Sequence, residues 1–189
     1  MTMPDLENVE ITAEAELWAW LEQHHAQTDG VLLITHKKSQ GARYVGRDAV
    51  LDALVAFGWI DGRRFTVDDK RTAQLITPRR VQHWSQSYKT RAQKLIEEGR
   101  MTPAGQASID AGKASGLWDF MADVDALITP PDLEAALIGP AATYYETCPD
   151  AYKRNLLRWV KLAKTDATRA KRVSAIAAAC AKGERIPQF

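Results

Sequence analysis

The sequence predicts an α+β protein, in which a small antiparallel sheet with helices is followed by a C-terminal all-helical unit. Three observations support this class. Short apolar runs bounded by turn residues, which are typical of strands, occur only before Pro78. After Trp84, apolar residues recur at helical spacing. The stretch Ile128-Thr129-Pro130-Pro131 indicates a linker, so we expect an α+β domain at residues 1–128 and a helical segment at residues 129–189.

The first predicted elements are a helix and a pair of strands. Thr12 and the acidic residues after it favour a helix start, because they suit the positive end of a helix. The apolar stripe of this helix consists of Leu17, Trp20, Leu21 and His24. A buried strand is expected at residues 31–35, and turn residues at 38–41 allow residues 43–46 to return as its partner.

The next predicted elements are a helix and two further strands of the same antiparallel sheet. Residues 47–57 place apolar side chains on one helical side, and Gly58 is a natural stop. Residues 59–65 and 71–77 alternate as strands around a polar turn. Pro78 then ends the sheet, because proline has no N–H to donate to a ladder.

Only helices are predicted after residue 84. The first runs from Trp84 to Glu98 with Gly99 as its cap, and Thr102-Pro103 starts the second with a hydroxyl at the N-cap and proline at N1. Residues 117–131 are expected to be a loop. The remaining helices are expected at residues 131–138, 141–147, 149–164 and 168–182.

Composition excludes several classes of protein. With 189 residues, 46% apolar and 26% charged, the chain is neither intrinsically disordered nor collagen-like, and Cys148 and Cys180 are too few for a disulfide-stapled fold. No apolar run reaches the ~20 residues of a transmembrane helix, and the N-terminal residues lack a secretory pattern, so we expect a cytoplasmic protein. Familiar nucleotide, hydrolase and metal motifs are missing, so neither a cofactor nor a metal is expected.

The net charge of +1 conceals a strong segregation of charge along the chain. Residues 1–36 carry −7, residues 37–100 carry +7, residues 101–150 carry −7 and residues 151–189 carry +8. Either these blocks pair internally or they leave a positive face for an anionic partner. The candidate surface for such a partner consists of Lys153, Lys161, Lys164, Lys171 and Arg172.

The densest group of unusual residues lies between residues 57 and 105. The functional hypothesis is that these residues form one ligand-binding pocket, which consists of Trp59, Asp61, Arg79, Arg80, Trp84 and Arg100. Trp59 and Asp61 fall on the same side of a strand, and arginine forks bind carboxylate or phosphate bidentately. Structural interpretations remain open beside this one. Asp61 can accept hydrogen bonds from the turn or from Arg80, and Trp84 can pack while Ser85 caps the next helix.

Several motifs carry a family resemblance. They are Gly58-Trp59-Ile60-Asp61-Gly62, Thr77-Pro78-Arg79-Arg80, Trp84-Ser85 and the run from Gly99-Arg100-Met101-Thr102-Pro103 to Gly105, followed by Tyr152-Lys153-Arg154 and Arg158-Trp159-Val160. In this order and spacing, residues 15–185 resemble the YdeI/OmpD-associated, bacteriocin-protection family, with an OmdA-like C-terminal segment. Tyr88 departs from the pattern, because such sequences commonly carry Asn there. The resemblance implies a bacterial, generally cytoplasmic protein linked to tolerance of bacteriocins or cationic antimicrobial peptides, with no settled enzymatic activity.

The leading interpretation is a non-catalytic binding or stress-tolerance protein. The first alternative is an enzyme that holds a small anionic substrate with its arginines and uses Asp61 as an acid or base, although no nucleophile–base pair is visible in the sequence. The second alternative is a nucleic-acid-binding protein that uses the basic C-terminal helices. The expected partner is accordingly an anionic small molecule, an anionic protein, a lipid surface or a nucleic acid.

Overall fold

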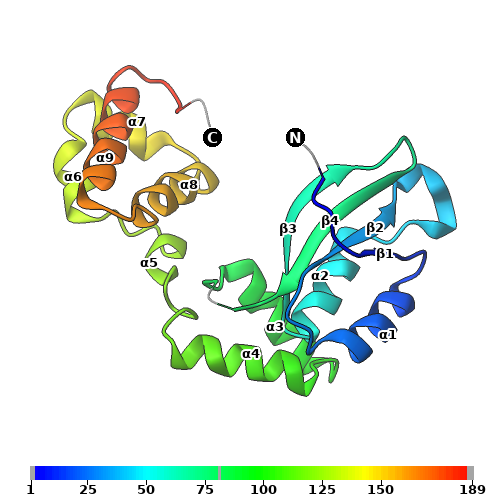
Figure 1. Cartoon of the computed structure of the whole chain (residues 1–189). Helices are drawn as coiled ribbons and strands as arrows, with labels where there is room; N and C mark the ends of the chain where they lie inside the picture. Colours follow the sequence, from blue (N-terminus) through cyan, green and yellow to red (C-terminus); the bar gives the residue numbers. More distant parts are fainter. Residues whose placement is uncertain (1–2, 81, 187–189) are drawn as a thin grey trace. The chain divides into compact units, whose positions relative to one another are not determined.

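The computed structural model describes residues 3–80 and 82–186 (Figure 1). It divides into two compact units, Met1–Asp119 and Phe120–Phe189. The elements of the first unit are β1 (Asn8–Glu10), α1 (Glu14–His24), β2 (Val31–His36), the 3₁₀ helix η1 (Lys38–Arg43), α2 (Arg47–Ala56), β3 (Trp59–Thr66), β4 (Arg71–Pro78), α3 (Gln86–Glu97) and α4 (Pro103–Ala114). The predicted α+β class is confirmed.

The four strands form one sheet in the order β1-β2-β4-β3. β3 and β4 form the predicted antiparallel hairpin, and β2 pairs antiparallel with β4. β1 was not expected, and it pairs parallel with β2, so the sheet is not wholly antiparallel. The predicted strand at residues 43–46 is wrong. Both edges of β2 are occupied, by β1 and β4, and the chain after β2 instead forms η1, with Gly41 at a φ of 59°.

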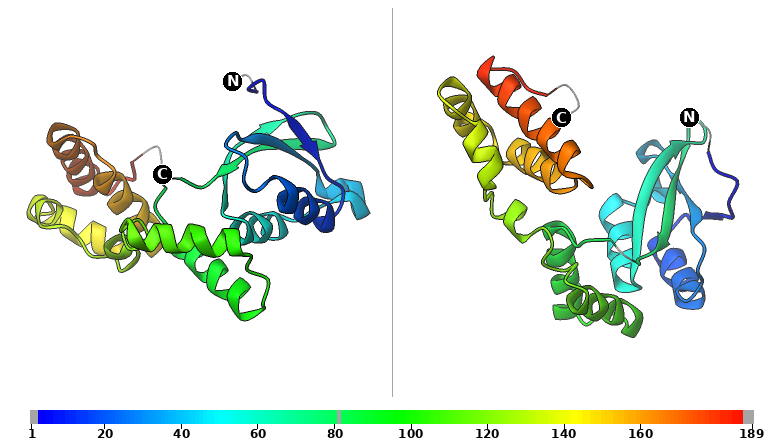
Figure 2. Two further views of the ribbon diagram at one scale, coloured as in Figure 1. Left: turned by 60° about the horizontal axis from the view of Figure 1, so that its bottom comes forward. Right: turned by 60° about the vertical axis from the view of Figure 1, so that its left-hand side comes forward.

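Helices α1 and α2 cover one face of this sheet, beneath it in the left view of Figure 2. Leu17 and Leu21 of α1 are fully buried and belong to the same core as Leu33 and Ile76 of the sheet. Fully burying each such side chain contributes about 1.5–3 kcal/mol, so this layer supplies much of the stability of the unit. On the other face, a smaller cluster gathers around Leu32 and Ile34.

Helices α3 and α4 are attached to α2. From α3, Arg91 donates to Asp48 at 2.7 Å and also to the largely buried Asp52. At the start of α4, Thr102 is the predicted N-cap, and its hydroxyl accepts a hydrogen bond from the Gly105 N–H at 3.3 Å. The same hydroxyl donates to the carbonyl of Ala56 at the end of α2. Two helix ends are thereby joined by one side chain.

The second unit consists of helices among the described residues, and no strand occurs between residues 131 and 186. They are α5 (Ala122–Asp125), α6 (Pro131–Ala136), α7 (Pro140–Thr147), α8 (Asp150–Lys161) and α9 (Asp166–Ala181). The expected loop at 117–131 instead contains α5, because Met121 and Val124 are buried in the core of this unit. The division between the units therefore lies nine residues before the predicted boundary at 128.

Candidate functional site

A polar network lies on the helix-covered face of the sheet. Because side chains alternate along strands, Leu33 and Ile76 share this face with Gln74, which is opposite Leu33 in the register and 7% exposed. The Gln74 amide nitrogen donates to Asp61 Oδ2 at 2.9 Å, and its oxygen accepts from Arg64 Nη2 at 2.8 Å. A buried glutamine of β4 thus binds two charged side chains of β3.

Asp61 has a hydrogen-bond donor on each carboxylate oxygen. The Gln74 amide donates to Oδ2, and the hydroxyl of Tyr88 donates to Oδ1. Tyr88 belongs to the first turn of α3. Burial raises the pKa of Tyr88, and the hydrogen bond to Asp61 and its negative charge raise it further. The phenol therefore stays protonated at neutral pH and acts as a donor.

Arg79 lies beside this network, directly after β4. Its backbone N–H donates to the carbonyl of Gly58 at 2.9 Å. Its guanidinium lies over the ring of Trp84, 4.0 Å from the ring centroid, and 4.8 Å from that of Tyr88. Nη1 donates to the carbonyls of Gln82 and His83 at 3.4 and 3.3 Å. The rings and these carbonyls together fix the plane of the guanidinium.

The other edge of the Arg79 guanidinium is left without partners. Nε and Nη2 are buried, and neither has a hydrogen bond to any part of the chain that the structure describes. These two N–H groups point the same way and form the side-on edge that binds a carboxylate bidentately. Desolvation lowers the pKa of Arg79 to about 10, and electrostatic interactions with Tyr88 and Asp61 offset part of that shift.

The structure brings three of the six predicted pocket residues together, namely Asp61, Arg79 and Trp84. Trp84 is 1% exposed and packs against Trp118, as the structural interpretation expects. Ser85 occupies the N-cap position of α3, but its hydroxyl bonds the Ser87 hydroxyl instead of the helix backbone.

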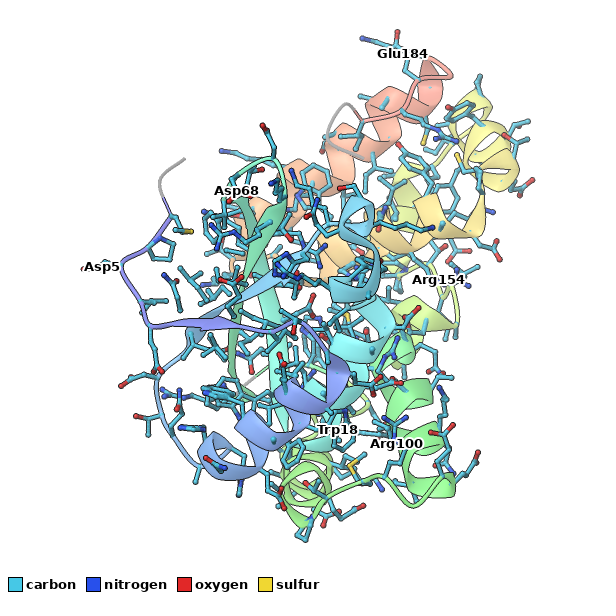
Figure 3. All side chains as sticks on the ribbon, turned by 90° about the vertical axis from the view of Figure 1, so that its right-hand side faces the viewer. Asp5, Trp18, Asp68, Arg100, Arg154 and Glu184 are labelled. Carbon is cyan, nitrogen blue, oxygen red and sulfur yellow. The ribbon has the colours of Figure 1, made fainter. Side chains whose placement is uncertain are left out.

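The other three predicted residues lie elsewhere. Trp59 is fully buried in the core, where its Nε1 donates to the carbonyl of His25 at 3.2 Å. Arg80 is exposed and donates to the carbonyl of Thr28 at 2.6 Å. Arg100 joins a different group, because it pairs with Glu14 at 2.8 Å and lies over the ring of Trp18 (Figure 3). These contacts separate the side chains that are close in the sequence motifs.

Two members of the network were missed by the sequence analysis. Tyr88 departs from the family pattern, yet it takes a polar role as the donor to Asp61. Gln74 lies between Ala73 and Leu75, and alternation alone places these apolar neighbours inward and Gln74 outward. The pairing register reverses that assignment, because Gln74 shares its face with Leu33 and Ile76. No local signal in the sequence distinguishes the two possibilities.

The predicted basic surface of the second unit is partly paired within that unit. Lys161 contacts Asp123 at 2.5 Å, and Lys153 donates to the carbonyl of Glu146. Arg172 donates to the carbonyl of Trp159 and lies over its ring. Lys164 and Lys171 are exposed, and neither has an ion pair with a described residue. Of the five predicted residues, Lys161 is thus paired with an acidic side chain among the described residues, whereas Lys164 and Lys171 are the exposed ones that lack such a pair there.

Among residues 3–80 and 82–186, no three His, Cys, Asp or Glu side chains gather as metal ligands. Within the same ranges, no helix combines the length and the apolar character that crossing a membrane requires.

Comparison with protein-family models finds one match within each of the two units. Residues 9–108, more than half of the chain, match the family described as a domain of unknown function (DUF8412). Residues 126–183 match the OmdA family, described as bacteriocin-protection, YdeI or OmpD-associated. No curated protein and no solved structure matches the chain. The chain therefore belongs to the DUF8412 family, and its C-terminal segment is the OmdA domain that the sequence motifs predict.

Proposed function

We propose that this protein is a non-catalytic, cytoplasmic binding protein that serves tolerance of bacteriocins or cationic antimicrobial peptides, and that its first unit binds a small carboxylate at Arg79. The match of residues 126–183 to the bacteriocin-protection family supports the biological role. The unpartnered edge of Arg79 supports the chemistry and is the observation on which the proposal rests.

The geometry of Arg79 favours a planar carboxylate as the ligand. Leaving buried donors without partners costs about 1–3 kcal/mol for each group, more where the group is charged, and a bidentate carboxylate satisfies both at once. Trp84 and Tyr88 occupy positions over the guanidinium, so the ligand approaches in its plane. The two carboxylate oxygens then face Nε and Nη2.

The surroundings of Asp61 favour binding over acid–base catalysis. Each Asp61 oxygen already accepts a hydrogen bond, one from Gln74 and one from Tyr88, so the carboxylate is held in place by the protein itself. The raised pKa of Tyr88 removes it as a base near neutral pH. Asp61, held by Gln74 and Tyr88, is therefore suited to orient the neighbouring Arg79 guanidinium through electrostatic attraction.

The ligand reaches Arg79 through a conformational step. Nε and Nη2 have no exposed surface, and the carbonyls of Gln82 and His83 hold the opposite side of the guanidinium. These residues belong to the connection between β4 and α3, where residues 82–85 form no helix or strand. We expect this connection to move when the ligand enters, so that association is slower than at a site that is already open.

The test is a calorimetric titration of the full chain with sodium benzoate, a planar carboxylate, at constant ionic strength. We expect saturable binding by the wild type. Arg79→Gln abolishes it, and Arg79→Lys, which keeps the charge but lacks the fork, weakens it at least tenfold. The matched control is Arg80→Gln, which removes the same charge from the neighbouring exposed residue and retains binding.

Two results would contradict the proposal. One is the lack of saturable benzoate binding by a folded wild type. The other is an equal loss in Arg80→Gln and Arg79→Gln, because that would show a general effect of charge. Circular dichroism of each variant establishes that it is folded before the titrations are compared.

A further inference from the structure

A small, partly open cavity lies apart from Arg79, where β2, η1 and the start of α2 meet β3 and β4. Its volume is about 160 Å³. The residues that line it include Lys37, Lys38, Arg47 and Arg64, together with His36 and Gln74. Four of them carry a positive charge, and none is an aspartate or glutamate.

Only some of the positively charged side chains of this cavity have hydrogen-bond or ion-pair partners among the described residues. Lys37 donates to the carbonyl of Asp68 at 2.9 Å, and Arg64 donates to Gln74. Lys38 and Arg47 are exposed and have no ion pair with a described residue. Four cations that converge without an acidic residue repel one another, and an anion among them relieves that repulsion.

The start of α2 adds a further electropositive group. Gly46 is the N-cap, so no side chain accepts hydrogen bonds from the amides of the first turn. Val45 and Arg47, on either side of this N-cap, both line the cavity. The amides and the positive end of the helix dipole favour an anion at this position.

His36 provides an independent indication of a missing partner. It is 7% exposed and lines the cavity. Its Nε2 contacts Glu10, which does not line the cavity, whereas Nδ1 is buried and has no hydrogen-bond partner among the described residues. Buried polar atoms normally have partners. Nδ1 accepts when Nε2 donates to Glu10, so a water molecule or an O–H group of a ligand is expected beside it.

The volume of the cavity limits the size of the ligand that it can hold. Its volume is roughly five times the ~30 Å³ that a water molecule occupies in the liquid. It is below the ~300 Å³ at which pockets for drug-sized molecules begin. A group of about five non-hydrogen atoms fits this space. Because the cations come from η1, α2 and the sheet, they surround the cavity from several sides, which suits tetrahedral oxygens better than a planar carboxylate.

We propose that this cavity is a binding site for a phosphoryl group, held by Lys38, Arg47 and Arg64 at the start of α2. The site is distinct from the edge of Arg79 and needs none of the atoms proposed to bind there. Gln74 lines the cavity and also bonds Asp61, so one residue connects the two networks.

The test is a calorimetric titration of the full chain with inorganic phosphate and, separately, with glycerol 3-phosphate, against sodium chloride of equal ionic strength. Saturable binding of inorganic phosphate alone indicates a site for the free ion. Binding of both, with the ester at least as tight, indicates the phosphoryl group of a small molecule. Either result supports the proposal, and no saturable binding of either by the folded protein overturns it.

Variants that remove one positive charge distinguish binding at this site from a general effect of the protein's charge. Lys38→Gln and Arg47→Gln, at exposed positions that do not support the core, are each expected to weaken binding about tenfold or more. Arg43→Gln is the matched control, because Arg43 is an exposed residue of η1 that does not line the cavity. Equal loss in Arg43→Gln overturns the proposal. Arg79→Gln should leave phosphate binding unchanged, so this proposal and the one for Arg79 fail independently.

Discussion

The contact between α4 and the end of α2 predicts a large destabilisation by Gly105→Ala. Gly105 is buried in the first turn of α4, and a Cβ atom there would lie 2.5 Å from Met101 Sδ and 2.7 Å from the carbonyl carbon of Ala56. The flexible side chain of Met101 is able to move aside. The backbone of Ala56 is not, because it belongs to the last turn of α2. The variant therefore forces α4 away from α2.

The magnitude follows from the contacts that this movement disturbs. Overpacking costs about 1–3 kcal/mol. The Ala56 carbonyl also accepts hydrogen bonds from Thr102 Oγ1 at 2.5 Å and Thr102 N at 3.2 Å, and each contributes about 0.5–1.5 kcal/mol. Replacing glycine by alanine within a helix returns about 1 kcal/mol. Together these contributions predict that the free energy of unfolding falls by about 1–5 kcal/mol, with a central value of about 3 kcal/mol.

The assay is urea denaturation followed by tryptophan fluorescence. Five of the six tryptophans lie in the first unit, so their emission reports mainly on its unfolding. The control is Ala107→Gly, at an exposed position of the same helix, which measures helix propensity alone and is expected to cost about 1 kcal/mol. If Gly105→Ala is as stable as the wild type or more so, the reasoning about a close approach of α2 and α4 is refuted.

Two further predictions concern the second unit. The hydrogen bond from Arg169 holds the pKa of Asp132 below its ordinary value of 3.8, so the pair stabilises the fold above about pH 4, and this stabilisation is lost as the pH falls through the folded pKa. Arg169→Gln should therefore lower the free energy of unfolding at pH 7 by less than about 1 kcal/mol, because both side chains are partly exposed. It should have no effect near pH 2. Unfolding followed by circular dichroism at both pH values measures this, and an equal effect at the two pH values would contradict it. If the basic surface of the second unit binds duplex DNA, Lys164 and Lys171 carry the binding, and replacing both by glutamine should reduce the slope of log K against log salt by about 2. Titration of labelled DNA between about 50 and 200 mM salt checks this, and no binding by the intact protein would remove nucleic acid as a partner.

Most secondary structure could be predicted because its signals are local. The N-cap and N1 residues Thr102 and Pro103 begin α4, as expected from a hydroxyl that accepts a backbone N–H and a proline that needs none. Gly58 and Gly99 end α2 and α3 with positive φ values, which glycine adopts without strain. Each signal lies within a few residues of the element that it starts or ends.

Strand pairing could not be predicted in the same way. The sequence contains a plausible partner for β2 at residues 43–46, and turn residues precede it. The partners that β2 actually has, β1 and β4, are separated from it by a helix or by more than thirty residues. Which strand occupies an edge depends on long-range packing, so local pattern favoured the nearer and wrong partner.

The sequence by itself determined the α+β class, most of the helices, the family of the C-terminal domain, and Asp61, Arg79 and Trp84 as residues of interest. Only the tertiary structure decided which of these residues meet. The register of β3 and β4 turned Asp61 and Gln74 inward, α3 brought Tyr88 to Asp61, and Arg100 was directed to Glu14 instead. The physical reason is that a sequence motif fixes the order of its residues, whereas the direction of each side chain follows from pairing and packing with distant segments.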